Sequence, residues 1–346
     1  MNERAPSFPE KTSYWEQLQR VAIDLGLELQ TQVPLSRYTS ARIGGPAQLL
    51  VEVHSSAQLK PLIAFVWEHQ IPYTLLGGGS NVLISDEGLD GLVIINRAKG
   101  RARMRFDLNA TPPLLWADAG VSLSHLARQA AARGLSGLEW ACGIPGTLGG
   151  AVVNNAGAFG GEISQNLAVV TILHRHYRGD HILAFQEQWT AAEMNYQYRS
   201  SRLKHSPGQA VVLSALLRLE RGNPREIREK MEELSRRRRQ TQPPGASLGS
   251  MFKNPPGDFA GRLIDAAGLK GLTIGGAMIS PLHANFFINL GHATAGDVWD
   301  LIQTARQAVR EKFGIDLELE IQPLGNFPTS RARSGQTTIL IEGKYG

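Results

Sequence analysis

Cysteine is almost absent from the chain: Cys142 is the only one among 346 residues. One thiol can form neither an intramolecular disulfide nor a Cys-rich zinc site, and such chains are typical of a reducing compartment. Long apolar runs are also missing, since none approaches the ~18 residues of a membrane span. The first residues, MNERAPSFPEKT, show no signal-peptide pattern. We therefore expect a cytoplasmic protein with no membrane contact.

Charge is scarce as well. Charged residues make up 19% of the chain, below the ~25% usual for globular domains. The net charge of +5 suits an anionic small-molecule substrate and does not by itself indicate nucleic acid. Hydrophobic residues reach 42%, enough to bury real cores. At ~150 residues per domain, the length indicates about two domains or three small ones.

Glycine is abundant, with 37 residues and no three-residue period, which indicates turns and close backbone approaches. A first cluster, Gly77-Gly78-Gly79-Ser80-Asn81, follows an expected strand. Backbone N–H groups in such a loop can hold a pyrophosphate, although a tight turn is its commoner role. The loop is not a Rossmann fingerprint, because Val82 stands where the third glycine would be.

A second glycine cluster covers residues 143–150 (GIPGTLGG) and continues over 154–157 (NNAG). Small residues there would let a flat ring or a pyrophosphate lie against the backbone. A tightly packed helix start is the alternative. The two clusters together favour a large nucleotide cofactor.

Apolar periodicity and capping signals predict alternating helices and strands. Ser13 and Glu16 form a capping box that would open the first helix. Further helices are expected over 58–70, 122–133, 224–239 and 294–313, and strands over 47–53, 73–76, 91–96, 116–120, 167–174, 210–220 and 317–321. Residues 101–115 are expected to form a hairpin or loop excursion. The expected units are residues 1–96, 97–222 and 223–325, followed by a tail over 326–346.

Arg236–Arg239 is the most basic run. Nucleic-acid binding is one interpretation, but the run ends an amphipathic helix, where cations complement the helix dipole. No interleaved aromatic side chains are available there to stack on bases. We therefore prefer a structural role for the run.

Two further groups of residues carry little chemical signal by themselves. The histidines show no metal-binding spacing, so we expect no metal site, and His174 and His176 are expected on a solvated strand face. Residues 247–255 (SLGSMFKNP) read as a polar loop. No G-x-S-x-G elbow surrounds Ser250, which argues against a serine hydrolase.

Eight segments match one known family in order. They are TSARIGGPA (39–47), LGGGSNVL (76–83), GLEWACGIPGTLGGAVVNNAGAFGGEI (137–163), YRSSRLK (198–204), SLGSMFKNP (247–255), AGRLI (260–264), HANF (283–286) and ELE (318–320). Through them the chain resembles the UDP-N-acetylenolpyruvoylglucosamine reductase family, flavoenzymes of bacterial cell-wall synthesis. The resemblance runs from about residue 35 to 325.

This resemblance implies both fold and activity. The fold class would be α+β, with a two-part FAD-binding region of vanillyl-alcohol-oxidase (PCMH) type and a C-terminal α+β substrate domain. The activity would be the NADPH-dependent reduction of UDP-N-acetylglucosamine enolpyruvate to UDP-N-acetylmuramate through non-covalent FAD. That reaction serves peptidoglycan synthesis, and with it cell-wall biogenesis, cell shape and cell division. The implied partners are the two small molecules, and we expect a monomer that binds no nucleic acid.

Three catalytic positions carry over from the family. Ser250 matches the proton donor, and Arg199 and Glu320 match its electrostatic partners. Hydride addition to the enolpyruvyl double bond leaves negative charge beside the carboxylate, and a cation such as Arg199 stabilises that charge. A serine hydroxyl is protonated near pH 7 and can donate its proton. Glu320 either orients the carboxylate end or acts as the acid itself.

Binding residues are also implied. Tyr198, Lys253 and Asn254 are expected at the substrate, with a surface charge as the alternative for Lys253. His283 and Asn285 are expected to be substrate-side or structural. The cofactor-binding positions are Arg42, Gly77, Gly78, Gly79, Ser80, Asn81, Gly143, Ile144, Pro145, Gly146, Gly150, Asn155, Ala156 and Gly157.

The chain also departs from the family pattern. Leu203 stands where a phenylalanine is usual, and Leu282 stands where a lysine often precedes the histidine. The short stretch between Gly161 and Arg199 indicates the branch that lacks an inserted Tyr-bearing loop over the substrate. A flavin oxidase or dehydrogenase of the same fold, acting on another substrate, is the alternative. It would be expected to lack the joint set of catalytic residues.

Overall fold

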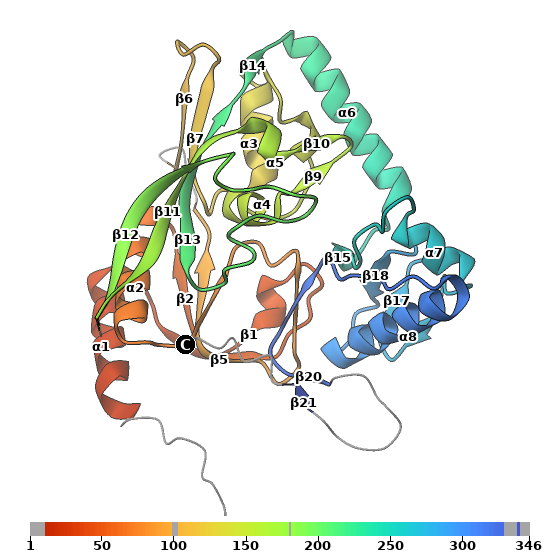
Figure 1. Ribbon diagram of the computed structural model, residues 1–346, viewed down its shortest axis with the longest axis horizontal. Helices are drawn as coiled ribbons and strands as arrows, with labels where there is room; N and C mark the ends of the chain where they lie inside the picture. Colours follow the sequence, from red (N-terminus) through yellow and green to blue (C-terminus); the bar gives the residue numbers. More distant parts are fainter. Residues whose placement is uncertain (1–10, 99–102, 180, 329–337, 340–346) are drawn as a thin grey trace, which may run out of the picture.

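The computed structural model describes residues 11–98, 103–179, 181–328 and 338–339. Figure 1 shows the N-terminal strands and helices in red and orange at the lower left, with the central yellow and green elements above them. The C-terminal helices and strands, in blue, lie at the right. Three sheets organise these parts.

The first sheet has the strand order β1-β2-β5-β3. β1 (Gln30–Pro34) runs antiparallel to β2 (Pro46–Val53), while β5 (Leu89–Asn96) runs parallel to β2 and β3 (Tyr73–Leu76). Residues 91–96 are all buried, as is typical of a parallel strand covered on both faces. The neighbouring elements are α1 (Lys11–Asp24), the short η1 (Leu35–Tyr38), α2 (Ser56–Glu68) and β4 (Val82–Ile84).

The second sheet has the order β12-β11-β13-β7-β6 and is antiparallel throughout. Its strands are β6 (Met104–Asp107), β7 (Leu114–Asp118), β11 (Leu167–Arg178), β12 (His181–Thr190) and β13 (Ala210–Arg218). Its core also receives apolar side chains from α3 (Leu123–Ala131), β8 (Leu135–Ser136), η3 (Glu139–Ala141), α4 (Leu148–Asn154) and α5 (Ile163–Asn166). The same part of the chain contains the short strands β9 (Gly157–Ala158), β10 (Gly161–Glu162) and β14 (Glu220–Arg221).

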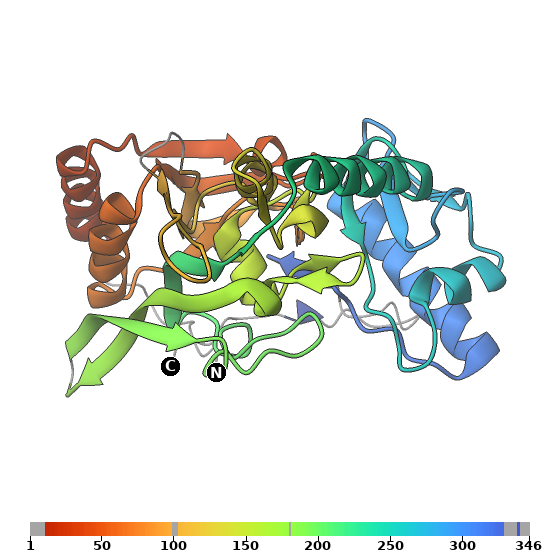
Figure 2. The same cartoon turned by 90° about the horizontal axis from the view of Figure 1, so that it is seen from above.

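The long helix α6 (Pro224–Thr241) leads to the third sheet, and Figure 2 shows it crossing from the central elements to the blue C-terminal ones. That sheet has the order β15-β18-β17-β16. Its strands are β15 (Ala246–Ser250), β16 (Thr273–Ile274), β17 (Ala277–Ile279) and β18 (Phe286–Asn289), and α7 (Ala260–Ala266) and α8 (Ala295–Phe313) pack into the same core. β20 (Phe327–Pro328) then pairs with β21 (Thr338–Ile339).

The chain returns to its N-terminal part after α8. β19 (Gln322–Leu324) pairs in parallel with β4, with Gln322 opposite Val82. The chain that follows the C-terminal sheet is therefore joined to the N-terminal part by backbone hydrogen bonds, while α6 connects the second sheet to the third. The proposed unit boundaries stay a prediction.

Several sequence expectations differ from the structure. Ser13 lies inside the helix α1 (Lys11–Asp24) and therefore cannot be its cap. Residues 317–321 form no strand, because their only ladder contact is the isolated bridge between Leu319 and Phe252. The expected loop at 247–255 begins as β15, and the strand β12 was not expected. By contrast, the helix expected over 294–313 is confirmed as α8, which a Thr294 capping box opens and a left-handed Gly314 ends.

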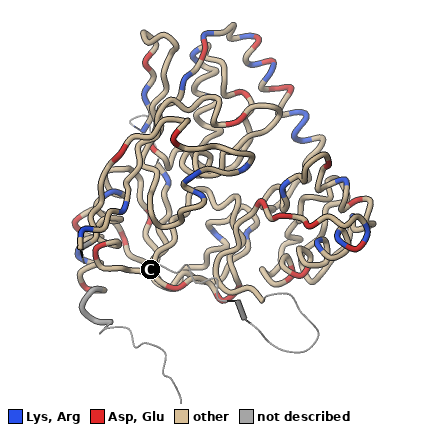
Figure 3. Tube along the Cα trace, in the orientation of Figure 1, with Lys and Arg blue, Asp and Glu red and all other residues tan. Residues whose placement is uncertain are grey.

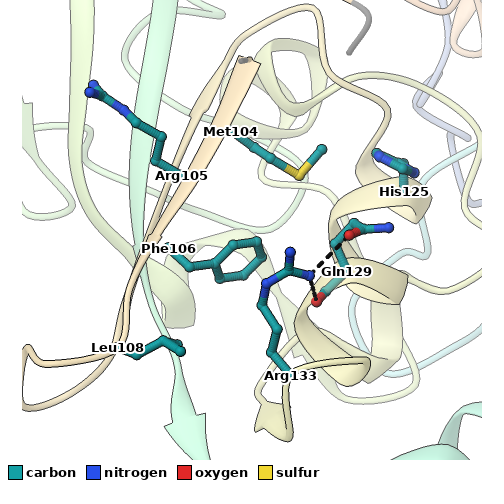
Figure 4. Close-up of a pocket in the computed structure, with 7 residues that line it drawn as sticks. All are labelled: Met104, Arg105, Phe106, Leu108, His125, Gln129 and Arg133. Atoms are coloured by element: carbon teal, nitrogen blue, oxygen red, sulfur yellow. Dashed lines mark hydrogen bonds between the residues drawn. The ribbon is translucent and has the colours of Figure 1, made fainter. Parts of the chain in front are cut away.

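The predicted excursion at 101–115 is a hairpin where it is described. β6 and β7 pair from Met104 to Asp107, and residues 101–102 lie outside the described residues. β6 and α3 border a pocket of about 670 Å³. Figure 4 shows Arg133 beside Phe106 in this pocket, with the guanidinium carbon 4.3 Å from the ring centroid. The hairpin is thereby packed onto α3.

The basic run on α6 packs against the protein in part. Arg236, Arg237 and Arg239 are exposed, while Arg238 is half-buried with its guanidinium 5.3 Å from the Phe159 ring centroid. Figure 3 shows acidic and basic residues following one another along α6. This packing supports the structural interpretation of the run. Among the described residues, no helix is long and apolar enough to cross a bilayer.

Candidate active site

The two glycine clusters lie against each other. A Cβ atom added at Gly78 would come within 2.7 Å of the Gly146 Cα, a distance that real side chains do not reach. The Ser80 hydroxyl donates to the Pro145 carbonyl at 3.2 Å and links the same two loops. Glycine is required here because the backbones approach so closely. The result is a close contact of two glycine-rich backbones, a feature that suits the binding of a phosphate or a flat ring.

The segment containing Arg42 closes this first loop. Ser40 donates its backbone N–H to the Gly79 carbonyl at 2.9 Å. Gly79 has a φ of +59°, and a Cβ there would lie 1.9 Å from the Tyr38 carbonyl oxygen. Arg42 is exposed and also left-handed, with a φ of +56°. The structure therefore brings Arg42 and residues 77–81 into one region.

The rest of the second cluster surrounds α4. Asn155 ends this helix in a left-handed conformation and is 1% exposed. Its Nδ2 donates to the Gln197 carbonyl at 3.1 Å, so the cluster contacts the turn that carries Arg199. Three other predicted positions donate their backbone N–H groups: Gly143 to the Ser124 hydroxyl, Gly150 to the Thr147 hydroxyl and Ala156 to the Ala151 carbonyl. Ile144 packs on the core of the second sheet.

Arg199 and Glu320 form an ion pair. The Arg199 Nε lies 2.7 Å from the Glu320 Oε1, and both side chains are less than one-fifth exposed, at 19% and 18%. The Arg199 guanidinium also donates to the Gly157 carbonyl at 2.7 Å and the Asn155 carbonyl at 3.5 Å. Arg199 has a φ of +55°, a conformation that costs a non-glycine residue about 1–3 kcal/mol. Backbone strain of this kind is typical of functional sites.

Ser250 is the last residue of β15, next to an irregularity in the sheet. The register with β18 shifts between Ser247 and Ser250, and Gly249 has a φ of +77°. Such bulges re-aim a side chain next to an active site. The following residue, Met251, accepts the backbone N–H of Glu320 at 2.9 Å. The three predicted catalytic residues are thus brought together, two by direct contact and Ser250 through its neighbour.

The first glycine loop also holds Glu320. Asn81 donates its Nδ2 to the Glu320 carbonyl at 3.1 Å and accepts the Gln322 backbone N–H at 2.9 Å. The predicted cofactor loop is therefore hydrogen-bonded directly to the backbone that carries the predicted catalytic carboxylate.

Comparison with known proteins agrees with this geometry. The family model "FAD binding domain" matches residues 47–174, and "UDP-N-acetylenolpyruvoylglucosamine reductase, C-terminal domain" matches residues 240–324. The curated reductase of Chloroflexus aggregans is 40% identical over 301 residues, which cover 86% of this chain and 98% of the relative. The chain belongs to the UDP-N-acetylenolpyruvoylglucosamine reductase family.

Other members of the family agree. The reductase of Caldanaerobacter subterraneus is 43% identical, with 86% of this chain and 94% of the relative covered. The crystal structure of the family member from Thermus caldophilus matches with a TM-score of 0.69 and 38% identity, covering 86% of this chain and 99% of that one. The predicted α+β fold with a two-part FAD-binding region and a C-terminal domain is confirmed.

FAD is the cofactor that this fold accommodates. Gly77, Gly78, Gly79 and Gly146 carry no side chains, so a pyrophosphate could approach their backbone N–H groups closely. These loops would hold FAD, with Asn81 and Asn155 linking them to the Arg199–Glu320 ion pair. Within the described part of the chain, no group of three His, Cys, Asp or Glu side chains is placed to hold a metal.

The residues of this chain that are predicted to contact the substrate lie in different surroundings. Tyr198 is 49% exposed, and the Arg199 guanidinium carbon lies 5.2 Å from its ring centroid. Lys253 pairs with Glu318, so it is not an isolated surface charge. Asn254 accepts the Ala260 backbone N–H at 3.1 Å and supports the start of α7. Their contacts to substrate stay a prediction.

His283 and Asn285 support the loop that follows Ser250. The His283 Nδ1 accepts the Asn285 backbone N–H at 3.2 Å, and burial lowers the pKa of this imidazole. Asn285 is 3% exposed, and its amide accepts from the Phe252 N–H at 2.9 Å and donates to the Phe252 carbonyl at 2.8 Å. Both partners of the Asn285 amide are therefore backbone groups of the active-site loop.

Asn285→Ala is expected to lower the free energy of unfolding by about 2–4 kcal/mol, since it leaves two buried backbone groups unpaired at ~1–3 kcal/mol each. Urea unfolding measures this change. The matched control is Asn254→Ala in the same loop, which removes a single part-buried bond at the start of α7 and should cost only ~1 kcal/mol. Equal losses in the two variants would contradict the structural role of Asn285.

One residue near the site received no role from the sequence. Lys204 closes the segment YRSSRLK and is half-buried, with its Nζ 3.0 Å from the Arg199 carbonyl oxygen. The signal that the sequence offered for this residue was its place, five positions after the predicted catalytic arginine. Its contact with the Arg199 backbone is not revealed by the sequence.

Proposed function

We propose that this chain reduces UDP-N-acetylglucosamine enolpyruvate to UDP-N-acetylmuramate, with NADPH as hydride donor and non-covalent FAD as cofactor. This is a step in the synthesis of peptidoglycan precursors, and through it the enzyme serves cell shape and division. Family membership over most of the chain supports the reaction. The observation that carries the site assignment is the Arg199–Glu320 ion pair, held beside the Ser250 loop by residues 81 and 251.

FAD held by the two glycine loops would, once reduced by NADPH, supply the hydride for the substrate. Arg199 then stabilises the negative charge that develops next to the substrate carboxylate, because its guanidinium is fixed at three acceptors before the reaction begins. Ser250 donates the proton that completes the reduction. Glu320 holds the Arg199 guanidinium in place, which favours the electrostatic role over that of the acid.

Binding of both ligands is assigned to the regions that surround this centre. Residues 77–81, 143–146, 150 and 155–157 hold FAD together with Arg42. The exposed Tyr198 and the half-buried Lys253 contact the substrate. Cys142 is half-buried with its Sγ 3.5 Å from the Ser235 hydroxyl, in keeping with a packed side chain and not with a flavin attachment point. The protein acts as a cytoplasmic monomer.

The function is tested by NADPH oxidation with and without UDP-N-acetylglucosamine enolpyruvate. We expect a yellow protein that oxidises NADPH rapidly only when this substrate is present. Acid precipitation should release all of the flavin into solution. A yellow protein that consumes NADPH equally without the substrate would indicate a flavin oxidase. Flavin that stays on the precipitate would contradict non-covalent binding.

A further inference from the structure

Arg199 occupies a turn position that normally requires glycine. Gln197 and Ser200 exchange backbone hydrogen bonds of 3.1 Å in both directions, which leaves Tyr198 and Arg199 as the two central residues. Of these two, Arg199 has a positive φ, +55°. A turn with positive φ at its third residue is of type II, and glycine or asparagine is favoured there. An arginine at this position persists only when its surroundings hold it.

Neighbouring side chains anchor this turn from its C-terminal side. The Ser201 hydroxyl donates to the Val153 carbonyl at 2.6 Å and ties the segment to α4. The Ser200 hydroxyl contacts the His205 Nε2 at 2.7 Å. Lys204 donates its ammonium to the Arg199 carbonyl at 3.0 Å. Of these contacts, only the one from Lys204 reaches the strained residue itself.

The surroundings of Lys204 are unusual for a lysine. Burial, followed by the nearby Lys253, lowers the pKa of its ammonium, while Glu320 and Glu318 act in the opposite direction. Lys253 is paired with Glu318 and Arg199 with Glu320. Among the described residues, Lys204 forms no ion pair within 4.0 Å, and its recorded hydrogen bond goes to a neutral carbonyl. A half-buried charge placed this way is costly to the fold, which indicates a function.

We propose that Lys204 is a positioning residue: its bond to the Arg199 carbonyl holds the left-handed turn that presents the Arg199 guanidinium to Glu320 and to the substrate carboxylate. The guanidinium is fixed at one end by Glu320, Gly157 and Asn155. Lys204 fixes the other end, at the backbone. This inference rests on the proposed role of Arg199 in stabilising charge.

A positioning role differs measurably from direct substrate binding. A residue that positions Arg199 acts when charge develops, so its loss lowers the rate at saturating substrate. A substrate-binding residue instead contacts the carboxylate or diphosphate equally in the ground state and the transition state. Loss of such a residue changes the dissociation constant of the substrate and leaves the rate at saturation unchanged. The two half-reactions of the enzyme add a second distinction, because flavin reduction by NADPH does not involve the charge that Arg199 stabilises.

The experiment compares Lys204→Met with Lys204→Arg and uses Lys60→Met as a distant control. Lys60 is an exposed residue of α2, bonded to Gln186. In Lys204→Met we expect parental flavin content, melting temperature and flavin reduction by NADPH. Reoxidation by saturating substrate should fall ~10²-fold, as for a misplaced catalytic group. The substrate dissociation constant, from titration of the flavin spectrum, should stay near the parental value. Lys204→Arg should recover most of the rate.

A double variant makes the test specific. In an Arg199→Met background, adding Lys204→Met should cause no further loss of rate, because the group that Lys204 positions is gone. A parental reoxidation rate, a changed dissociation constant at unchanged rate, or a lost fold in Lys204→Met would each overturn the proposal. Failure of the unmodified enzyme to be reoxidised by the substrate would instead contradict the proposed function.

Discussion

Ser250→Ala is expected to separate the two half-reactions of the enzyme. Flavin reduction by NADPH should continue near the parental rate, because that step needs no proton from Ser250. Reoxidation by UDP-N-acetylglucosamine enolpyruvate should slow by at least ~10²-fold, since general acid catalysis contributes about 10²–10⁴-fold, or roughly 3–5 kcal/mol. Stopped-flow absorbance of the flavin follows each half-reaction separately.

The structure supplies a matched control for this prediction. Ser247 lies on the same strand, β15, opposite Ile288 and before the shift in register. Ser247→Ala removes the same hydroxyl group from the regular part of the ladder and should leave both half-reactions near the parental rate. If the reduced Ser250→Ala protein is reoxidised at the parental rate, Ser250 is not the acid, and Glu320 becomes the first candidate.

Gly78→Val should abolish FAD binding. Even the first atom of the new side chain would lie 2.7 Å from the Gly146 Cα, and backbone atoms cannot give way as a flexible side chain can. The two glycine loops must therefore separate, which disrupts the site assigned to the pyrophosphate. We expect colourless protein, measured as the ratio of flavin to protein absorbance, with far-UV circular dichroism close to that of the parent.

Gly296→Val is the control for the glycine substitution. Gly296 lies in the first turn of α8, and a Cβ there would meet its nearest neighbours at 3.6 and 3.7 Å, which is ordinary contact. This variant should keep its flavin. Normal flavin content in Gly78→Val would mean that the loop at 77–81 is only a tight turn.

Sequence predicted the elements whose signals are local. The capping signal at Thr294 and the apolar face of residues 294–313 are local signals, and they predicted α8. Residues 317–321 show why a local pattern can mislead. Leu317 and Ile321 are buried, as the alternation predicts, but the backbone bonds of this segment go to the irregular loop at 251–253. The buried face of this segment was predicted correctly, but its pairing as a β-strand was not.

The residues of the site could be identified from the family resemblance, but the contacts that hold them in place could not. The motif identified Arg199, yet turn preferences place glycine or asparagine at such a position, so an arginine with positive φ could not be expected. The contact between residues 78 and 146 joins loops far apart in sequence, and no local signal encodes it. Lys204 acts through a backbone carbonyl, which composition and spacing do not reveal.

The pairing of β19 with β4 has a consequence for the order in which the protein is assembled. The bond from Asn81 to Glu320 spans 239 residues, and closing so long a loop costs conformational entropy before any contact repays it. During synthesis, N-terminal units fold while the rest of the chain is still being made. Glu320 is synthesised 239 residues after Asn81, and β19 follows shortly after it. The glycine loop is therefore built first and waits for the predicted catalytic carboxylate, so a nascent chain lacks the complete candidate site until β19 has been made.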